Sequence, residues 1–478
     1  MESLEIVGRI KEQATLKATL QSAEAELVAV TGRRRVGKTF LVKQVFQEQI
    51  LFEITGLQDE ALDKQLAHFR FTLFRYSQDE SLQTPKDWLE AFQKLVLYLD
   101  KQVSKHKKVI FFDEVPWLAS QKSDFLTGLG FFWNSWAVNH KVVLVICGSA
   151  ASWMVEHVVD NKGGLHNRIT KLVHLEPFTL RETELFLQKR DITLKRGQIV
   201  ELYMALGGIP HYLKEVEAGK SAAQNIDHIC FSKRALLYNE FSRLYAALFA
   251  HAHKHIAVIQ ALATSRQGLT REQIVSKTGL SNGGHTTRIL SELEQSGFIT
   301  VYSIFGNKKK DRLHRLTDEF SLFYLQFMES HRNEEAGTWL HLSQTQAYKI
   351  WCGYAFENLC LKHLAQIKLA LGIAGVYSKA SAFSLKGSPT EKGIQIDLLL
   401  DRKDNIINIF EIKFYNAAWT LTADDAHKLR EKLRIFQQNT NTNKHLMLTL
   451  VAAQGLKQNN HSIGLVEKVL TLDDLFLE

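Results

Sequence analysis

The chain has 478 residues, more than the roughly 250–300 that one hydrophobic core accommodates, so we expect several domains. Its composition is 45% hydrophobic and 23% charged with only five prolines, which excludes long disordered or collagen-like tracts. The net charge of +8 and the pI near 9.0 fit a polyanionic partner, but over this length they are a mild excess and do not decide the function.

The four cysteines, Cys147, Cys230, Cys352 and Cys360, form no C-x-x-C pair and lie in apolar sequence. They are predicted to be reduced thiols in the core of a cytoplasmic protein. No apolar run approaches the ~20 residues that a membrane helix needs, and no cationic start leads into an apolar run. The sequence therefore predicts a cytoplasmic protein without a membrane partner.

The first predicted strand, residues 27–30, leads directly into a phosphate-binding loop. Residues Gly32 to Thr39 match the pattern G-x-x-x-x-G-K-[ST], and an amphipathic helix follows them. Glycines let backbone N–H groups surround a phosphate, and the helix N-terminus adds its positive end. Lys38 is predicted to reach the β- and γ-phosphates of ATP and Thr39 to bind Mg²⁺, which makes Gly37, Lys38 and Thr39 the least replaceable. Arg35, inside the loop, is also predicted to contact the nucleotide.

Two later strands are predicted to end in polar residues of the same site. In KVIFFDEVPWL an apolar strand ends in Asp113, predicted to hold the Mg²⁺ water shell, and Glu114, predicted to orient or deprotonate the attacking water. The strand at residues 142–147 runs into Ser149, which is predicted to sense the γ-phosphate or the water at the carboxyl edge of the sheet. The alternative for Ser149 is an ordinary cap of the next helix.

From residue 179 to 250, apolar residues recur at three- and four-residue steps, which predicts a helical lid. Residues 251–320 predict a winged helix-turn-helix whose wing turns at FGNKKKDR. The positions expected to contact double-stranded DNA are His285, Thr286 and Arg288 in the major groove and Lys308, Lys309 and Lys310 at phosphates. The alternatives are a protein-contact module or spacer, with the lysines in a merely solvated turn.

Residues 321–478 return to a mixed α/β pattern. The segment GIQIDLLLDRKDNIINIFEIKFY predicts two strands joined by a turn at residues 401–405. A symmetric hairpin would place Asp397 opposite Ile409, so alternation would bring Asp397, Glu411 and Lys413 to one side. The opposite, buried side would hold Ile396, Leu398, Phe410, Ile412 and Phe414. Two carboxylates for Mg²⁺ or Mn²⁺ and a lysine for the attacking water suit a metal-dependent hydrolase, and a half-exposed charged hairpin is the alternative.

The segments GRRRVGKT, FFDE, ICGSA and GGIPHYL together resemble the archaeal-type ATPases of the STAND/AAA+ division, over essentially the whole chain. The resemblance implies an α/β multidomain protein with an ATPase core at 1–178, a lid at 179–250, a winged helix at 251–320 and a restriction-endonuclease-like domain at 321–478. It further implies that Gly208 and Pro210 lie near the nucleotide and that Arg168 acts on phosphate as an arginine finger. A solvated loop charge is the alternative for Arg168.

The arrangement D-x₁₃-E-x-K resembles the PD-(D/E)XK nucleases, with Ile396 where a proline often stands. In this family a helix before the hairpin supplies a further catalytic and metal-binding acid, and Glu357 fits that place. Glu357 shares a helix face with Leu361 and Leu364, which is unusual for a carboxylate that only needs solvent. The basic residues of the following helix, Lys428, Arg430, Lys432 and Arg434, are expected to line a phosphodiester path or to form a solvated face.

The leading hypothesis is an ATP-regulated, Mg²⁺-dependent DNA endonuclease of host defence or mobile elements. A second hypothesis is a DNA-binding ATPase regulator whose nuclease-like domain is inactive, and a third is a STAND-type sensor that binds a protein. The sequence leaves open whether the chain forms a homo-oligomer and whether a protein trigger exists.

Overall fold

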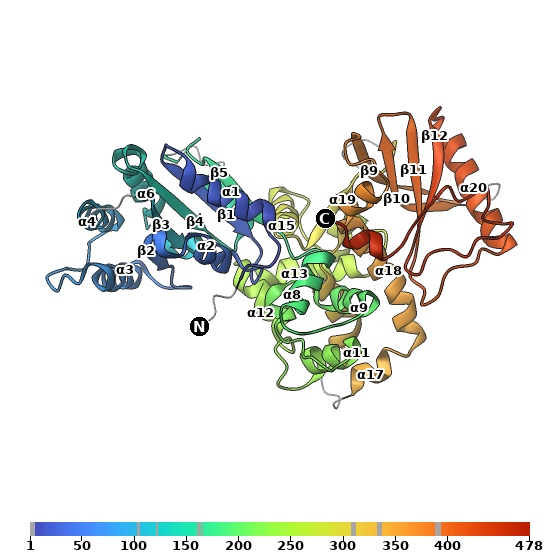
Figure 1. Cartoon of the computed structure of the whole chain (residues 1–478), viewed down its shortest axis with the longest axis horizontal. Helices are drawn as coiled ribbons and strands as arrows, with labels where there is room; N and C mark the ends of the chain where they lie inside the picture. The colour runs from blue at the N-terminus through green and yellow to red at the C-terminus, as the bar shows by residue number, and fades with distance from the viewer. Residues whose placement is uncertain are drawn as a thin grey trace. The chain divides into compact units, whose positions relative to one another are not determined.

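The structure is a computed structural model that describes residues 5–102, 106–120, 123–159, 164–165, 167–306, 312–331, 337–387 and 393–478. Its contacts divide the chain into two compact units, Met1–Pro177 and Phe178–Glu478. Figure 1 follows the helices and strands of both units in chain order.

Unit 1 is built on a parallel sheet of five strands in the order β2-β3-β4-β1-β5. The strands are β1 (Glu26–Gly32), β2 (Ile50–Thr55), β3 (Lys108–Asp113), β4 (Val142–Cys147) and β5 (Lys171–Leu175). Strands β1, β3 and β4 are nearly continuous runs of buried apolar residues, as expected for parallel strands covered on both faces. Because the strands are parallel, all of their carboxyl ends lie at one edge of the sheet.

The helices of unit 1 are α1 (Ile10–Gln21), α2 (Lys38–Phe46), α3 (Leu62–Ser77), α4 (Trp88–Asp100), α5 (Val115–Leu118), α6 (Phe125–Ser135) and α7 (Ala151–Met154). Aromatic side chains connect α3, α4 and α6 to the sheet. Phe92 of α4 packs against Phe112 of β3 with ring centroids 5.6 Å apart, and it stacks on Phe132 of α6 at 5.3 Å. This core fixes the sheet edge on which the polar strand ends lie.

Unit 2 begins with helices α8 (Leu180–Gln188), α9 (Arg196–Leu206), α10 (Pro210–Leu213), α11 (Ala222–Ile226) and α12 (Glu240–Leu248). These lie within the predicted lid. The predicted winged-helix segment contains α13 (Ala252–Ala263), β6 (Leu269–Thr270), α14 (Arg271–Thr278), α15 (Gly284–Gln295), β7 (Ile299–Tyr302) and β8 (Leu313–Leu316). Its strands pair antiparallel in the order β6-β8-β7. We call this segment, residues 252–316, the α13–β8 module.

The rest of unit 2 contains helices α16 (Glu319–Phe323), α17 (Thr338–Leu342), α18 (Gln346–Lys362), α19 (Leu364–Ala370) and α20 (Ala423–Thr440). It also contains a mixed sheet in the order β13-β12-β11-β10-β9. Its strands are β9 (Ser378–Leu385), β10 (Ile394–Arg402), β11 (Ile406–Lys413), β12 (His445–Ala452) and β13 (Lys468–Leu470). Strands β11 and β12 are parallel, as are β12 and β13, whereas β10 is antiparallel to both of its neighbours.

The predicted hairpin of β10 and β11 is confirmed, but its predicted register is wrong by two residues. Leu399, rather than Asp397, lies opposite Ile409, because Asp401 and Arg402 continue β10 and shorten the turn. The pairing of β10 with β9 also shifts between Ile396 and Leu399. Such a bulge breaks the alternation of side chains, so a shared side for the three ionic residues does not follow from their odd numbers.

The apolar residues of the hairpin are not confined to even positions either. Leu399, Ile407 and Ile409 are fully buried, in one cluster with Ile396 and with Phe436 of α20. Ile412 and Phe414, predicted to be buried, are only partly so. The strands are therefore covered on both faces over most of their length, as in a central position of an α/β sheet, and the ionic residues lie near the strand ends.

All four cysteines are buried and unpaired, as predicted. Burial raises the pKa of the Cys147 and Cys230 thiols, which keeps them protonated and unreactive. Within the described ranges, no helix is long and apolar enough to cross a membrane.

The end of β1 tests how tightly the first sheet is packed. Gly32 has φ +137°, and an added Cβ would lie 2.4 Å from the carbonyl oxygen of Leu175 on β5. We expect Gly32→Ala to lower the thermal unfolding midpoint of the ligand-free protein by roughly 5–10 °C, through backbone strain and separation of β1 from β5. Gly197→Ala is the control, because an added Cβ there meets no atom within 4 Å. Equal midpoints for the two variants would contradict this packing.

Candidate functional site

The loop between β1 and α2 has the backbone of a phosphate-binding loop. Arg35 and Gly37 have φ of 71° and 93°, so the loop closes on itself before α2 begins at Lys38. Lys38 is buried, and its Nζ donates to the carbonyl oxygens of Gly32 and Arg33, both at 2.9 Å. The ammonium group is thus held inside the loop, where it can exchange these carbonyls for phosphate oxygens.

The hydroxyl of Thr39 and the carboxylate of Asp113 meet across the strand ends. Thr39 Oγ1 donates to Asp113 Oδ2 at 2.7 Å, although β4 separates β1 from β3 in the sheet. Hydroxyl and carboxylate oxygens are hard ligands of the kind that Mg²⁺ prefers, and these two are already adjacent. The chemistry of this pair fits Mg²⁺, which Thr39 and Asp113 would hold next to the loop.

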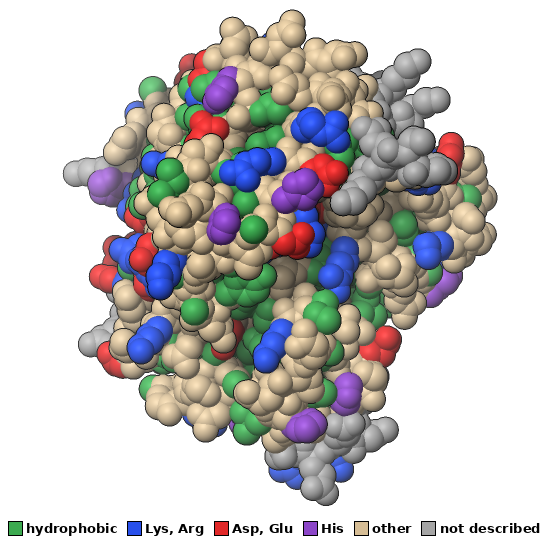
Figure 2. All heavy atoms as spheres, turned by 90° about the vertical axis from the view of Figure 1, so that its right-hand side faces the viewer, with side chains coloured by type: hydrophobic (Ala, Val, Ile, Leu, Met, Phe, Trp, Pro, Cys, Tyr) green, Lys and Arg blue, Asp and Glu red, His purple; other side chains and the backbone are tan. Residues whose placement is uncertain are grey.

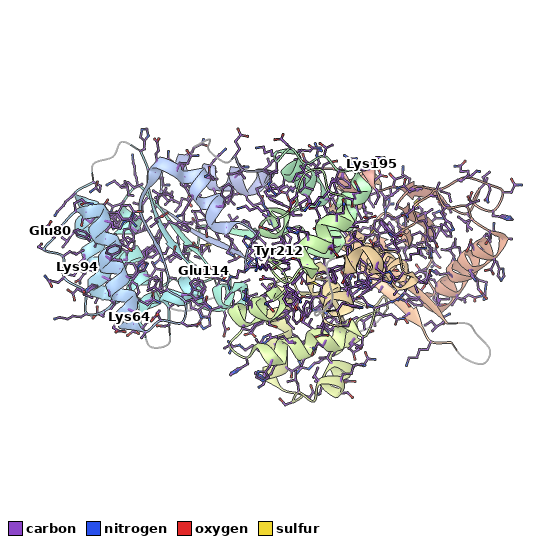
Figure 3. All side chains as sticks on the ribbon, turned by 90° about the horizontal axis from the view of Figure 1, so that it is seen from below. Lys64, Glu80, Lys94, Glu114, Lys195 and Tyr212 are labelled. Atoms are coloured by element: carbon purple, nitrogen blue, oxygen red, sulfur yellow. The ribbon has the colours of Figure 1, made fainter. Side chains whose placement is uncertain are left out.

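Glu114 and Ser149 form the second polar contact at this edge. The Ser149 backbone N–H and Oγ both donate to Glu114 Oε2, at 3.0 and 2.8 Å. Glu114 itself has φ 48°, a left-handed conformation that turns the chain between β3 and α5. In Figure 3, Glu114 is labelled in unit 1. The Ser149 hydroxyl thus contacts the carboxylate that is predicted to act on the attacking water, and its role as a sensor of phosphate or water stays a prediction.

Two further predictions concern Arg168 and the GGIP segment. Arg168 lies in an exposed turn of unit 1, where its N–H donates to the Leu165 carbonyl at 3.0 Å. Pro210 starts α10 in unit 2. Gly208, just before it, accepts a hydrogen bond from Phe178 at 2.6 Å, and a Cβ on Gly208 would lie 2.0 Å from the Phe178 carbonyl oxygen. The GGIP segment therefore has a packing reason for its glycine, and its nucleotide role stays a prediction.

In the C-terminal sheet, Glu411 and Lys413 lie at the end of β11. Lys413 Nζ is 2.8 Å from Glu411 Oε1, and Lys432 of α20 donates to Glu411 Oε2 at 2.6 Å. Burial alone would raise the pKa of Glu411, but the ammonium groups of Lys432 and Lys413 outweigh it and hold the pKa below its usual value. Lys413 also lies over the ring of Trp419, 5.5 Å from its centroid. The carboxylate is thus ionised and held between two cations.

Glu357 is the helix acid predicted for the C-terminal site. It lies on α18, and burial followed by the nearby Asp397 carboxylate raises the pKa of Glu357 to about 7, despite the opposing charges of Arg315 and Lys413. Asp397 accepts a hydrogen bond from Gln395 Nε2 at 2.5 Å. Glu357 is therefore within electrostatic range of both Asp397 and Lys413, which brings together the helix acid, the bulged strand β10 and the end of β11.

Sequence patterns missed two residues of this cluster. Arg315 of β8 donates from Nη2 to Glu357 Oε2 at 3.2 Å, and Gln395 holds Asp397. Lys432 is predicted, with three other basic residues of its helix, to line a phosphodiester path or a solvated face, and it contacts Glu411. An arginine within the short strand β8, directly before the apolar Leu316, is the one signal that could have pointed to a buried partner.

The donor chemistry of the C-terminal cluster fits a divalent cation, whereas the present arrangement does not assemble a ligand cage. Within the described residues, no three His, Cys, Asp or Glu side chains are grouped so that they could hold a metal ion. Glu411 is engaged by Lys413 and Lys432, Glu357 by Arg315 and Asp397 by Gln395. Basic side chains and the Gln395 side-chain amide thus contact the carboxylate oxygens that a metal would require.

The residues predicted to read DNA differ in their accessibility. Thr286 is a correction: it is fully buried and its hydroxyl donates to the Ser281 carbonyl at 2.7 Å, because this position of α15 faces the interior of the module. His285 is exposed and lies 3.1 Å from Lys254 Nζ, and Arg288 is exposed but paired with Glu292 at 2.8 Å. Lys308, Lys309 and Lys310 lie outside the described residues. On the face drawn in Figure 2, lysines and arginines are interspersed with acidic and apolar side chains rather than joined in one patch.

Comparison with known proteins gives one family and several distant likenesses. Residues 6–216 match a family described as an ATPase domain predominantly from Archaea. An uncharacterized protein of Methanocaldococcus jannaschii is 24% identical over 416 residues, which cover 85% of this chain and 87% of that protein. The Walker-type ATPase PABY2304 of Pyrococcus abyssi is similar at a TM-score of 0.46 and 16% identity, over 67% of this chain and 96% of that structure. The ORC2 protein of Aeropyrum pernix, solved in ADPNP–ADP complexes, gives 0.41 and 14%, over 69% and 94%.

The loop, the parallel sheet and the polar strand ends define a P-loop nucleotide-binding domain. More particularly, residues 6–216 match an ATPase domain found predominantly in Archaea, which supports ATP as the nucleotide of this loop.

The contact between Thr39 and Asp113 predicts how nucleotide binding depends on Mg²⁺. We expect Asp113→Asn to weaken the binding of a fluorescent ATP analogue in Mg²⁺ by roughly 10-fold or more, because the amide cannot replace a carboxylate at the metal. In EDTA, the variant and the wild-type protein should bind equally. Asp63→Asn on the exposed side of α3 is the control. Wild-type affinity of Asp113→Asn in Mg²⁺ would contradict the assignment.

Proposed function

We propose that the protein hydrolyses ATP with Glu114 as the residue that orients and deprotonates the attacking water. The observation that supports this is the pair of hydrogen bonds from Ser149 to Glu114, next to the Thr39–Asp113 pair. A carboxylate that is held by two donors has a fixed direction, and a general base acts only when it lies within hydrogen-bond reach of its proton. Lys38 would neutralise phosphate charge, and Mg²⁺ would supply Lewis-acid stabilisation when bound.

Hydrolysis and binding are separable in this arrangement. We expect Glu114→Gln to lower kcat by roughly 10²–10⁴-fold, because an amide cannot accept the water proton, while nucleotide affinity is retained. Ser149→Ala should lower kcat by about 10-fold, because Glu114 loses the hydroxyl donor but keeps the backbone donor. Phosphate release under saturating ATP measures both effects, and Ser135→Ala, an exposed serine of α6, is the control. Full turnover by Glu114→Gln would remove Glu114 from the mechanism.

We also propose a second activity, the Mg²⁺-dependent cleavage of duplex DNA by the C-terminal domain. The supporting observation is that Glu357 lies under the influence of both Asp397 and Lys413, while Lys413 contacts Glu411. The carboxylates of Glu357, Asp397 and Glu411 would hold Mg²⁺, and Lys413 would position the water that attacks phosphorus. The ATPase domain would regulate this cleavage, and the α13–β8 module, as a winged helix, would contact the duplex through His285 and Arg288.

A plasmid-cleavage assay with Mg²⁺ or Mn²⁺, with and without ATP, tests the second activity. We expect Lys413→Ala and Asp397→Asn each to reduce cleavage by at least roughly 10²-fold, since each removes a group that the chemistry requires. Lys403→Ala is the matched control, because Lys403 is an exposed lysine in the turn between β10 and β11. Cleavage that survives Lys413→Ala would favour an ATPase whose C-terminal domain does not cut. ATP turnover that persists in Lys38→Ala would instead count against the first site.

A further inference from the structure

Arg315 brings a buried positive charge from the α13–β8 module to the carboxylates of the C-terminal sheet. Only 3% of the residue is exposed, and its Nη2 lies 3.2 Å from Glu357 Oε2. The guanidinium carbon lies 4.9 Å from the centroid of the Tyr354 ring. Among the described residues, Arg315 Nε has no hydrogen-bond partner. The guanidinium is thus stabilised mainly by charge and by an aromatic face, and its hydrogen bonding is incomplete.

The electrostatics around Arg315 involve two of the proposed metal ligands. Tyr354, Glu357 and Asp397 all favour its charged form, against the opposing effect of burial. A buried arginine needs compensating negative charge, and clustered buried carboxylates need positive charge. Glu357, which is 3.2 Å from Arg315, receives this compensation directly, and Asp397 lines the same pocket as Arg315.

The module is attached to the sheet around this contact. Beyond β7, Phe305 donates its N–H to the Ala382 carbonyl of the edge strand β9 at 2.8 Å, and Ala382 donates to Ser303 at 3.1 Å. The ring of Phe305 packs on Phe436 of α20 with centroids 5.3 Å apart. These contacts fix the distance between β8 and the sheet, and so they hold Arg315 in place.

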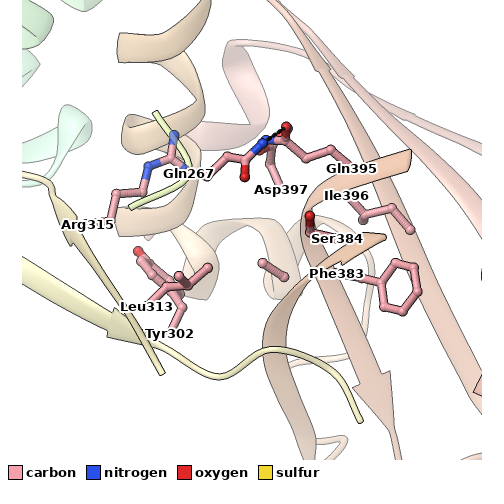
Figure 4. Close-up of a pocket in the computed structure, with 10 residues that line it drawn as sticks. Gln267, Tyr302, Leu313, Arg315, Phe383, Ser384, Gln395, Ile396 and Asp397 are labelled. Carbon is pink, nitrogen blue, oxygen red and sulfur yellow. Dashed lines mark hydrogen bonds between the residues drawn. The ribbon is translucent and has the colours of Figure 1, made fainter. Parts of the chain in front are cut away.

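Two consecutive hydrogen bonds also connect the module to Asp397. Gln267 of the module donates to Gln395 of β10, and Gln395 donates to Asp397 at 2.5 Å. Figure 4 shows these residues around a pocket that Arg315, Tyr302 and Ser384 also line. Asp397 is therefore held by an amide that the module itself holds, next to the arginine that the module supplies.

We propose that Arg315 is a resident counter-cation that competes with a divalent cation for Glu357 and Asp397, so that the docked α13–β8 module keeps the C-terminal site poor in metal. The inference rests on the proposed metal-dependent function of that site. A metal and the guanidinium are alternative sources of positive charge for the same carboxylates.

The test is Mn²⁺ binding by the full-length, nucleotide-free protein, followed by the electron paramagnetic resonance of free Mn²⁺. All proteins carry Asp113→Asn, which removes the carboxylate that is expected to help hold the metal in the ATPase domain. We expect Arg315→Gln to bind Mn²⁺ at least roughly 10-fold more tightly than the parent, because the amide carries no positive charge that competes with the metal for the carboxylates. Arg315→Lys keeps the charge and should bind more weakly than Arg315→Gln. Arg312→Gln is the matched control, because Arg312 is an exposed arginine just before β8.

The outcomes separate this inference from the proposed function. If the gain in Arg315→Gln disappears when Asp397→Asn is added, the metal binds at the proposed carboxylates and the inference is supported. Equal Mn²⁺ affinity in the parent and in Arg315→Gln, with both lost in Asp397→Asn, overturns the counter-cation and leaves the metal site intact. If none of the proteins has Mn²⁺ binding that depends on Asp397, the metal-dependent function fails, and the inference fails with it.

A second measurement applies if Arg315→Gln is unstable. Without its counter-cation, the buried Glu357 should lower the thermal midpoint in EDTA, and Mn²⁺ should restore it further than in the parent, because a ligand that binds only the folded state stabilises it. NaCl at equal ionic strength should not restore it. A variant whose midpoint responds to Mn²⁺ no more than the parent's contradicts the competition.

Discussion

The nucleotide site of unit 1 depends on one hydrogen bond, from Thr39 at the start of α2 to Asp113 at the end of β3. It joins the loop that follows β1 to a strand that is not a neighbour of β1 in the sheet. The bond is possible only because β1, β3 and β4 are parallel and end at the same edge, with β4 between the other two. The same arrangement places Ser149, after β4, against Glu114, after β3. Strand order thus converts three separate motifs into one site, and the buried strands below give the polar groups a rigid base.

Unit 1 could be predicted well because each motif of the site is local to one strand end. The strand predicted at residues 142–147 has the bounds of β4, and the predicted core strands lie within β1 and β3. A parallel sheet then brings the ends together without further information. What the sequence could not supply are contacts between motifs: the back-folded Lys38, held by its own loop, and the choice of Glu114 as partner of Ser149. Both contacts depend on how side chains pack in three dimensions, which the periodic pattern of apolar residues in the sequence does not determine.

The C-terminal site could be predicted only in part, for three physical reasons. A turn shorter by two residues moved the register, and a bulge at Asp397 ended the alternation on which the shared face had been argued. The helix face of α15 buries Thr286, although its place near the helix start suggested access to DNA. Arg315 and Lys432 reach the cluster from elements 42 and 21 residues away from their partners, so no local pattern could include them. The sequence indicated the ionic residues of the cluster, but not the basic side chains that contact them.

The prediction of a winged helix that only reads DNA does not account for the buried position of Arg315. A domain that only reads DNA would keep its arginines on the surface, because burial of a guanidinium is costly without a paired carboxylate. Here the partner carboxylate lies on α18, and Asp397 on β10 adds to the compensation, so the α13–β8 module and the C-terminal sheet share one charge balance. Linkage then acts in both directions: any change of positive charge at Glu357 and Asp397 alters how firmly the module is docked, and any movement of the module alters the affinity of those carboxylates for cations. The two segments are therefore one electrostatic unit, even though their secondary structures are separate.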